Sequence, residues 1–77
     1  MLAFVLVQTK GGKAENILEY WAKWREIKEA HILFGEWDFL LKVEVPNEQT
    51  LSTFVMEKVR GIPEVTVTNT LIVARSL

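Results

Sequence analysis

Apolar residues follow two different spacings along the chain, and these spacings predict its secondary structure. Residues 2–9 are apolar almost throughout, which is typical of a strand buried on both faces. Residues 10–13 contain two glycines between two lysines and predict a turn. Residues 14–25 then place apolar side chains three and four positions apart, so they predict an amphipathic helix.

The rest of the chain continues to alternate between strand and helix spacings. Polar and apolar residues alternate over 27–34, and 39–45 is mostly apolar, so both segments predict strands. Asn47 is a favourable N-cap for an amphipathic helix over 48–60, which a glycine and a proline bring to an end. Residues 64–74 alternate once more and predict the last strand.

The predicted order is therefore strand, helix, strand, strand, helix, strand within one domain, residues 1–77. This order predicts an α+β, ferredoxin-like βαββαβ sandwich, in which a four-stranded antiparallel sheet carries both helices on one face. A domain of 77 residues is only marginally stable as a monomer. The chain has no cysteine for disulfide bonds, so we expect self-association to reinforce the fold.

The face of the sheet without helices is the expected site of that association. The first and third strands are apolar on both faces, and a monomer seldom exposes a large apolar patch. We therefore expect a sheet-to-sheet dimer about a two-fold axis. The residues expected in its interface are Leu2, Phe4, Leu6 and Leu40.

Composition and charge exclude several other classes of protein. The net charge of −1 gives no support for a phosphate-binding surface, so direct contact with nucleic acid is not expected. With His31 as the only histidine and no cysteine, no metal site is expected, and the motifs suggest no cofactor. The sequence contains neither a recognisable signal peptide nor an apolar run long enough to span a membrane, so we expect a cytoplasmic protein without a membrane partner.

The turn before the third strand is the best candidate for chemistry. Gly35 allows a sharp turn whose amides point outward, and Trp37 and Asp38 follow it at the start of the strand. Such a loop could hold a small zwitterion, with amides facing its carboxylate and Asp38 facing its ammonium group. The alternative is a simple hairpin turn in which Asp38 caps the backbone and Trp37 packs locally.

These residues resemble those of a known family. The chain is similar to the C-terminal effector-binding and oligomerisation (RAM) domain of the Lrp/AsnC, or feast/famine, transcription regulators. The most specific match is a Gly-x-aromatic-Asp signature, followed by an Ile-Pro-x-Val exit from the second helix and a Thr-x-Thr segment in the last strand. The matching segments are residues 3–7, 35–43, 54–65 and 68–73.

The resemblance implies a sensor of small molecules. Sheet-to-sheet dimers would assemble into tetramers, octamers or larger rings, and a small amino acid or related metabolite would bind between dimers. Its loop would consist of Gly35, Glu36, Trp37 and Asp38, with Thr68 and Thr70 supplied by a neighbouring subunit. The family's DNA-reading helix-turn-helix is missing from this sequence, so we expect a stand-alone module that associates with itself and with full-length regulators of the family. Phe34 also departs from the family, which often has a small or polar residue there, and its bulky ring would narrow the pocket or shift its preference towards apolar side chains.

Two other functions remain as alternatives. Small dimeric ferredoxin-like proteins include cofactor-free oxygenases and isomerases, for which His31 and Asp38 are the available acids or bases. No nucleophile–base pair accompanies them, so we do not expect an enzyme. An RNA-binding sheet would use exposed aromatic residues, but the required Lys/Arg-Gly-aromatic signature is missing.

Overall fold

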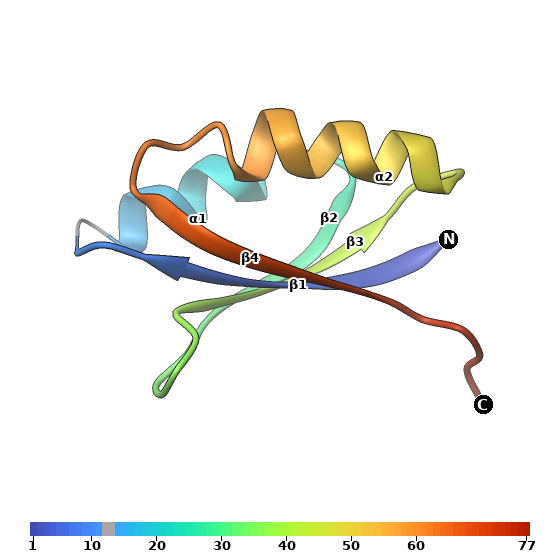
Figure 1. The fold of residues 1–77 in the computed structure, drawn as a ribbon, viewed down its shortest axis with the longest axis horizontal. Helices are drawn as coiled ribbons and strands as arrows, with labels where there is room; N and C mark the ends of the chain where they lie inside the picture. Colours follow the sequence, from blue (N-terminus) through green and yellow to red (C-terminus); the bar gives the residue numbers. More distant parts are fainter. Residues whose placement is uncertain (12–13) are drawn as a thin grey trace.

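The described residues fold into one antiparallel sheet with a layer of helices on one side. The structure is a computed structural model that describes residues 1–11 and 14–77. Within them the sheet has four strands in the order β2-β3-β1-β4, and every neighbouring pair is antiparallel (Figure 1). The elements are β1 (Leu2–Thr9), α1 (Ala14–Ala22), β2 (Ile27–Ile32), β3 (Phe39–Glu44), α2 (Glu48–Phe54), the π-helix η1 (Val55–Val59) and β4 (Val65–Ile72).

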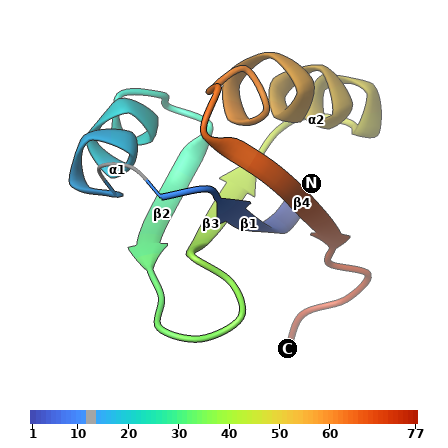
Figure 2. The ribbon, with the colours of Figure 1, turned by 60° about the vertical axis from the view of Figure 1, so that its left-hand side comes forward.

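This arrangement confirms the predicted ferredoxin-like fold. Both helices lie on the same face of the sheet, and η1 continues α2 without a break (Figures 1 and 2). The predicted turn at 10–13 includes Gly12 and Lys13, which lie outside the described residues.

The core lies between the sheet and the helices. Alternate residues of β1, Ala3, Val5 and Val7, are fully buried on this side. The ring of Trp21 from α1 packs edge-on against Phe39 of β3, with 5.0 Å between their centroids. The Trp21 indole nitrogen donates to the carbonyl oxygen of Lys58 (3.1 Å), so its polar group is satisfied inside the core. One side chain thus ties α1 to both the sheet and the end of the second helix.

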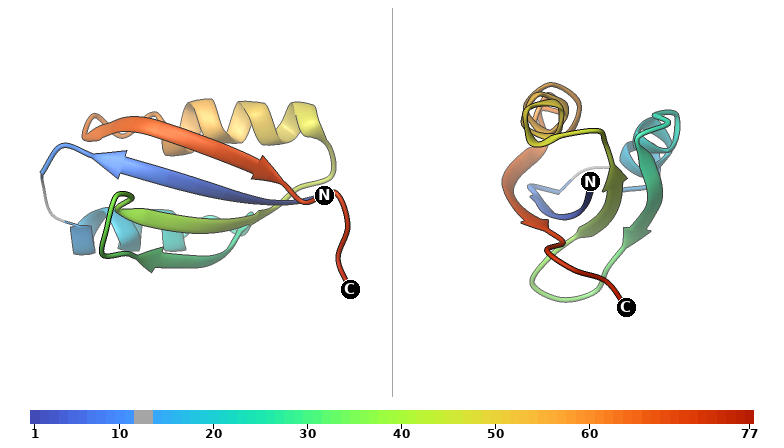
Figure 3. Two further views of the ribbon diagram at one scale, coloured as in Figure 1. Left: turned by 60° about the horizontal axis from the view of Figure 1, so that its bottom comes forward. Right: turned by 90° about the vertical axis from the view of Figure 1, so that its right-hand side faces the viewer.

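The other face of the sheet, which we call the open face, is also apolar at its centre. Leu2, Phe4 and Leu6 of β1 and Leu40 of β3 point to this side and are partly exposed. On β4, Val67 and Leu71 extend the same surface and are 44% and 50% exposed. No helix among the described residues covers this face, as the end-on view in Figure 3 makes clear. The prediction that both faces are apolar is therefore confirmed for β1. On β3 it holds only at Leu40, because Lys42 and Glu44 share its open side. The dimer stays a prediction.

Some element boundaries differ from the predicted ones because of tertiary contacts. The first helix ends at Ala22 rather than at residue 25, and tight turns follow in which Trp24 N–H donates to Trp21 O and Ile27 N–H to Trp24 O (both 3.0 Å). These turns reverse the chain in time for Ile27 to pair with Val43 of β3. The spacing over 14–25 predicts Ala22 and Arg25 on the buried side of that helix, but Ala22 is its last residue, Arg25 lies beyond it, and both are exposed.

The second helix begins as predicted and ends unexpectedly. The Asn47 side chain accepts a hydrogen bond from Thr50 N–H (2.8 Å), which is the predicted N-cap. From Val55 onward the helix widens to the π form, and Arg60 N–H donates to Val55 O (2.8 Å). A Cβ at Gly61 would overlap with the Glu57 carbonyl oxygen, so this wide turn requires glycine there.

Replacing Gly61 with alanine should therefore destabilise the fold. The added methyl group must displace the Glu57 carbonyl, and overpacking of this kind costs about 1–3 kcal/mol. Urea unfolding followed by circular dichroism measures the loss. Ser52→Ala, at an exposed position of the same helix, is the control and should stay within about 0.5 kcal/mol of the wild type. Equal stability of Gly61→Ala and the wild type would contradict the prediction.

Candidate functional site

The loop at residues 33–38 joins β2 to β3 and projects beyond the sheet. Gly35 has a φ of +131°, which favours glycine and allows the reversal. Leu33 N–H donates to Asp38 O (2.8 Å), and the Gln8 side chain donates to Glu36 O (2.8 Å). In Figures 1 and 2 the loop lies on the side of the sheet away from the helices. Hydrogen bonds therefore hold the loop at its base and leave its tip in solvent.

Asp38 stabilises the connection between strands. Thr9 N–H donates to its Oδ2 atom at 2.7 Å, and the Thr9 hydroxyl lies 3.4 Å from the same oxygen. The Asp38 N–H in turn donates to Val7 O (2.9 Å). The capping role considered from the sequence is thus present, although Asp38 caps the end of β1 rather than its own turn. Trp37 is partly buried, and Gly35 and Glu36 are exposed.

A small hollow of about 210 Å³ lies beside the Asp38 carboxylate. It lies where the ends of β1 and β2 meet the start of β3, and Ala14 of α1 borders it. Its lining residues are Thr9, Gly11, Ala14, Ile32, Leu33, Asp38 and Phe39. Of the predicted loop residues, only Asp38 contributes to this hollow.

Thr68 and Thr70 lie in a different hollow, which we call the α2–β4 groove. They pair with Val7 and Val5 of β1, so their side chains are on the face of the sheet that carries the helices. The groove runs between the second helix and the edge strand β4 and has a volume of about 310 Å³. Its lining residues are Glu48, Leu51, Ser52, Val55, Met56, Arg60, Thr68, Thr70 and Ile72.

The predicted site residues are thus divided between two places in one chain. The Asp38 hollow and the α2–β4 groove share no lining residue. Asp38 and Thr68 both border Val7, from opposite sides of β1, which separates their backbones by two strand spacings, or about 10 Å. A single chain therefore does not bring the loop and the threonines together around one ligand.

The sequence analysis missed the helical wall of the groove. Glu48, Ser52, Met56 and Arg60 follow one another at intervals of four residues, which places them on one side of the helix. That interval is visible in the sequence, but polar residues on the outer face of a helix normally indicate only solvent exposure. Only the position of β4 beside this stripe makes it the wall of a groove.

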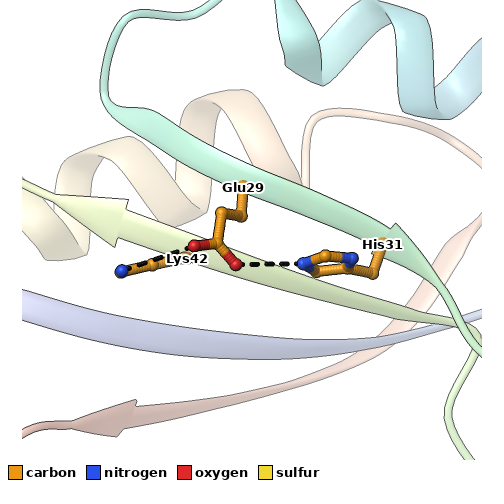
Figure 4. Close-up of polar contacts among 3 residues, drawn as sticks. All are labelled: Glu29, His31 and Lys42. Carbon is orange, nitrogen blue, oxygen red and sulfur yellow. Dashed lines mark hydrogen bonds and ion pairs between the residues drawn. The ribbon is translucent and has the colours of Figure 1, made fainter.

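His31 has a partner that the sequence analysis did not identify. Its Nε2 atom lies 3.1 Å from Glu29 Oε1 on the same strand, and Lys42 of β3 lies 3.4 Å from Glu29 Oε2 (Figure 4). The hydrogen bond to His31 and then the hydrogen bond and charge of Lys42 lower the pKa of the Glu29 carboxyl below its ordinary value. This cluster borders the apolar part of the open face, since His31 pairs with Leu40.

Tyr20 and Trp24 also belong to a local cluster. Their rings pack edge to face, with centroids 6.1 Å apart. The Lys58 ammonium lies 4.3 Å from the Trp24 ring centroid in a cation–π contact. Both aromatic rings therefore contribute to packing in the helix layer.

Two further classes of site find no support in the described part of the chain. Residues 1–11 and 14–77 contain no cluster of three or more His, Cys, Asp or Glu side chains that could hold a metal ion. Within the same ranges, no helix is both long and apolar enough to cross a membrane.

Comparisons with known proteins identify the family. A model of the Lrp/AsnC ligand binding domain matches residues 2–77. The HTH-type transcriptional regulator FL11 of Pyrococcus horikoshii is 36% identical over 76 residues, which are 99% of this chain and 50% of that protein. The chain belongs to the Lrp/AsnC family of ligand-binding domains, and it spans about half the length of the curated regulators it matches.

Solved structures agree with this assignment. The crystal structure of FFRP-DM1 superposes with a TM-score of 0.88 at 38% identity and covers 94% of this chain and 96% of its own. The L-Met complex of the transcriptional regulator NMB0573 from Neisseria meningitidis has a TM-score of 0.82 at 25% identity, over 99% of this chain and 51% of its own. The fold and the family therefore rest on matches that extend over nearly the whole chain.

The lowered pKa of Glu29 leads to a prediction about acid. Its charged form is favoured in the folded state, so its contribution to stability is complete above the ordinary value of 4.5 and is lost as the pH falls through the lower folded pKa. An NMR titration of the Glu29 side-chain carboxyl should have its midpoint below 4.5. His31→Ala and Lys42→Ala should each raise the midpoint, whereas Lys23→Ala, at an exposed position outside the cluster, should not. A midpoint that is the same in all four proteins would contradict this account.

Proposed function

We propose that this domain senses a small amino acid or related metabolite and changes its assembly in response. In this proposal the ligand binds between dimers, where Gly35, Glu36, Trp37 and Asp38 of one subunit meet Thr68 and Thr70 of another. The observation that supports the proposal is that Asp38 and the two threonines line separate hollows on either side of β1. A site assembled from two chains makes ligand binding and assembly one equilibrium, because a ligand favours the state that binds it best.

The open face supports the dimer in this proposal. Its apolar centre consists of Leu2, Phe4, Leu6 and Leu40, extended by residues of β4. A second copy that packs its own open face against this surface would remove both surfaces from water. With a two-fold axis, both partners use the same residues in the interface. The charged cluster of Glu29, His31 and Lys42 would then lie at the border of the interface, where partial solvation is possible.

The chemistry of the loop supports an amino-acid ligand. Asp38 borders its hollow with a carboxylate that suits an ammonium group, and the exposed turn at Gly35 and Glu36 would offer backbone amides to a carboxylate. Threonine hydroxyl groups both donate and accept, so Thr68 and Thr70 could bind either end of a zwitterion. The Neisseria regulator described above was crystallised with L-Met. Methionine is accordingly the first ligand to test, followed by the other standard amino acids.

Regulation of transcription would follow from association with other family members. The curated relatives are helix-turn-helix regulators of about twice the matched length. In this proposal the domain exchanges subunits with such regulators through the open face, and the bound ligand alters which assembly is favoured. DNA binding would then be supplied by the helix-turn-helix part of the regulator.

The ligand site can be tested by two substitutions of Asp38. Asp38→Asn keeps an oxygen for Thr9 N–H but removes the charge, so the fold should persist while amino-acid affinity falls about tenfold to a hundredfold. Asp38→Ala also removes the hydrogen bond and should lower stability by about 1–3 kcal/mol in addition. Calorimetric titration with each of the twenty amino acids measures affinity, and urea unfolding measures stability. Unchanged affinity in Asp38→Asn would exclude Asp38 from the site.

The dimer can be tested at the centre of the open face. Leu40→Asp would bury an unpaired charge in the proposed interface and should shift the protein to monomers. The same substitution at Leu77, which is fully exposed near the chain end, is the control and should leave the mass unchanged. Sedimentation equilibrium at micromolar concentrations measures both. A Leu40→Asp protein that remains a dimer would show that a different surface is shared.

A further inference from the structure

Phe34 is a fully exposed aromatic side chain at the tip of the loop at residues 33–38. The base of this loop is fixed by the Leu33–Asp38 hydrogen bond and by the bond from Gln8 to Glu36. The ring is thus presented to solvent on a short, restrained loop, so its burial against a partner would require little additional ordering. Aromatic side chains that fill a pocket of a partner supply much of the binding energy in protein interfaces.

The α2–β4 groove offers a matching surface. Its apolar residues are Leu51, Val55, Met56 and Ile72. The Met56 side chain is 68% exposed, so it is accessible to a partner. A methionine side chain adapts easily to the shape of an aromatic ring and makes favourable sulfur–aromatic contacts. The groove volume of about 310 Å³ leaves room for one large side chain.

The loop of a given chain points away from the groove of the same chain. The groove lies on the helix side of the sheet, because Thr68 and Thr70 share that face with the buried valines of β1. The loop projects from the opposite side, as the right-hand view of Figure 3 shows. A loop of this kind can therefore reach the groove only from another molecule.

Charge complementarity selects a second copy of this chain as that molecule. Glu36 follows Phe34 by two residues and is exposed at the same tip. Arg60 lines the groove, is exposed, and forms no ion pair within residues 1–11 and 14–77. Glu48 lies at the other end of the helix, so the end of the groove near Arg60 is the one suited to an acidic loop.

We infer that Phe34 of one copy inserts into the α2–β4 groove of a second copy, with Glu36 beside Arg60. This contact brings the first copy's Asp38 loop toward the second copy's Thr68 and Thr70, and each site is incomplete without the other chain. The inference rests on the proposed function, since it supplies the contact between subunits that a divided effector site requires. It also gives Phe34 a role that the loop chemistry alone does not.

A disulfide test can detect this contact directly, because the natural chain contains no cysteine. Glu36→Cys, which leaves the Phe34 ring in place, and Met56→Cys are made in separate chains that carry different affinity tags, mixed, and oxidised. Mixed disulfides isolated through both tags are quantified on a non-reducing gel. We expect the Glu36→Cys and Met56→Cys pair to cross-link at least about tenfold faster than Glu36→Cys with Leu77→Cys, although Leu77 is the more exposed of the two second positions. Equal rates for the two pairs would overturn the inference.

A charge exchange provides a second test that does not depend on cross-linking. Glu36→Arg and Arg60→Glu should each reduce the mass of the assembly measured by light scattering, and the protein that carries both changes should recover it. Glu36→Arg combined with Lys23→Glu is the matched control, since Lys23 lies outside the groove, and it should not recover the mass. Recovery in neither protein, or in both, would overturn the pairing of Glu36 with Arg60.

Amino-acid binding is measured separately, on the wild-type protein. The proposed effector function and the proposed Phe34 contact can therefore fail independently. Specific cross-linking without binding of any amino acid would support the contact and overturn the effector part of the proposed function. Binding of an amino acid without specific cross-linking would support the effector part of the proposed function and overturn the Phe34 contact. Phe34→Ser adds a further check, since it should reduce the assembly mass without unfolding the domain, because the side chain makes no contribution to the core.

Discussion

The pairing of β1 with β3 at the centre of the sheet is the constraint on which the rest of the structure depends. β1 is apolar on alternate residues of both faces, and Leu40 of β3 extends its open side, so the sheet needs cover on each side. The helices cover one side through the core that Trp21 and Phe39 share. The other side stays open in the single chain, and its apolar centre is the physical reason to expect association.

The same strand also separates the candidate site into two parts. β1 lies between β3 and β4, so its width separates the loop that leads into β3 from the residues of β4. Hydrogen bonds of Asp38 fasten the end of β1 to the start of β3 and so fix the base of the loop on that side of β1. In the function that we propose, the loop and the threonine groove are two halves of one site that different molecules complete. The family to which the chain belongs includes transcriptional regulators.

The second helix contributes both to the core and to the surface of this arrangement. Its inner residues pack on the sheet, whereas its residues at intervals of four form the wall of the groove. The wide turn from Val55 to Val59 changes the direction of the last side chains and leads through Gly61 into the edge strand. Met56 lies in this turn and Arg60 directly follows it. A local departure from α-helical geometry therefore shapes the groove in which we place the loop of a second copy.

The sequence by itself determined the element order, the ferredoxin-like fold, the N-cap at Asn47 and the family, because these depend on local spacing and on short motifs. It also indicated that both faces of β1 are apolar. Tertiary structure alone decided where the first helix ends, since Ile27 has to reach Val43. It alone also placed β4 beside the row of residues from Glu48 to Arg60 at intervals of four, and so made that row the wall of a groove. The contact between Asp38 and Thr9, 29 residues apart, likewise exists only because the sheet brings two strand ends together. Local sequence encodes which residues avoid water, whereas the choice of partner for each polar side chain depends on distant parts of the chain.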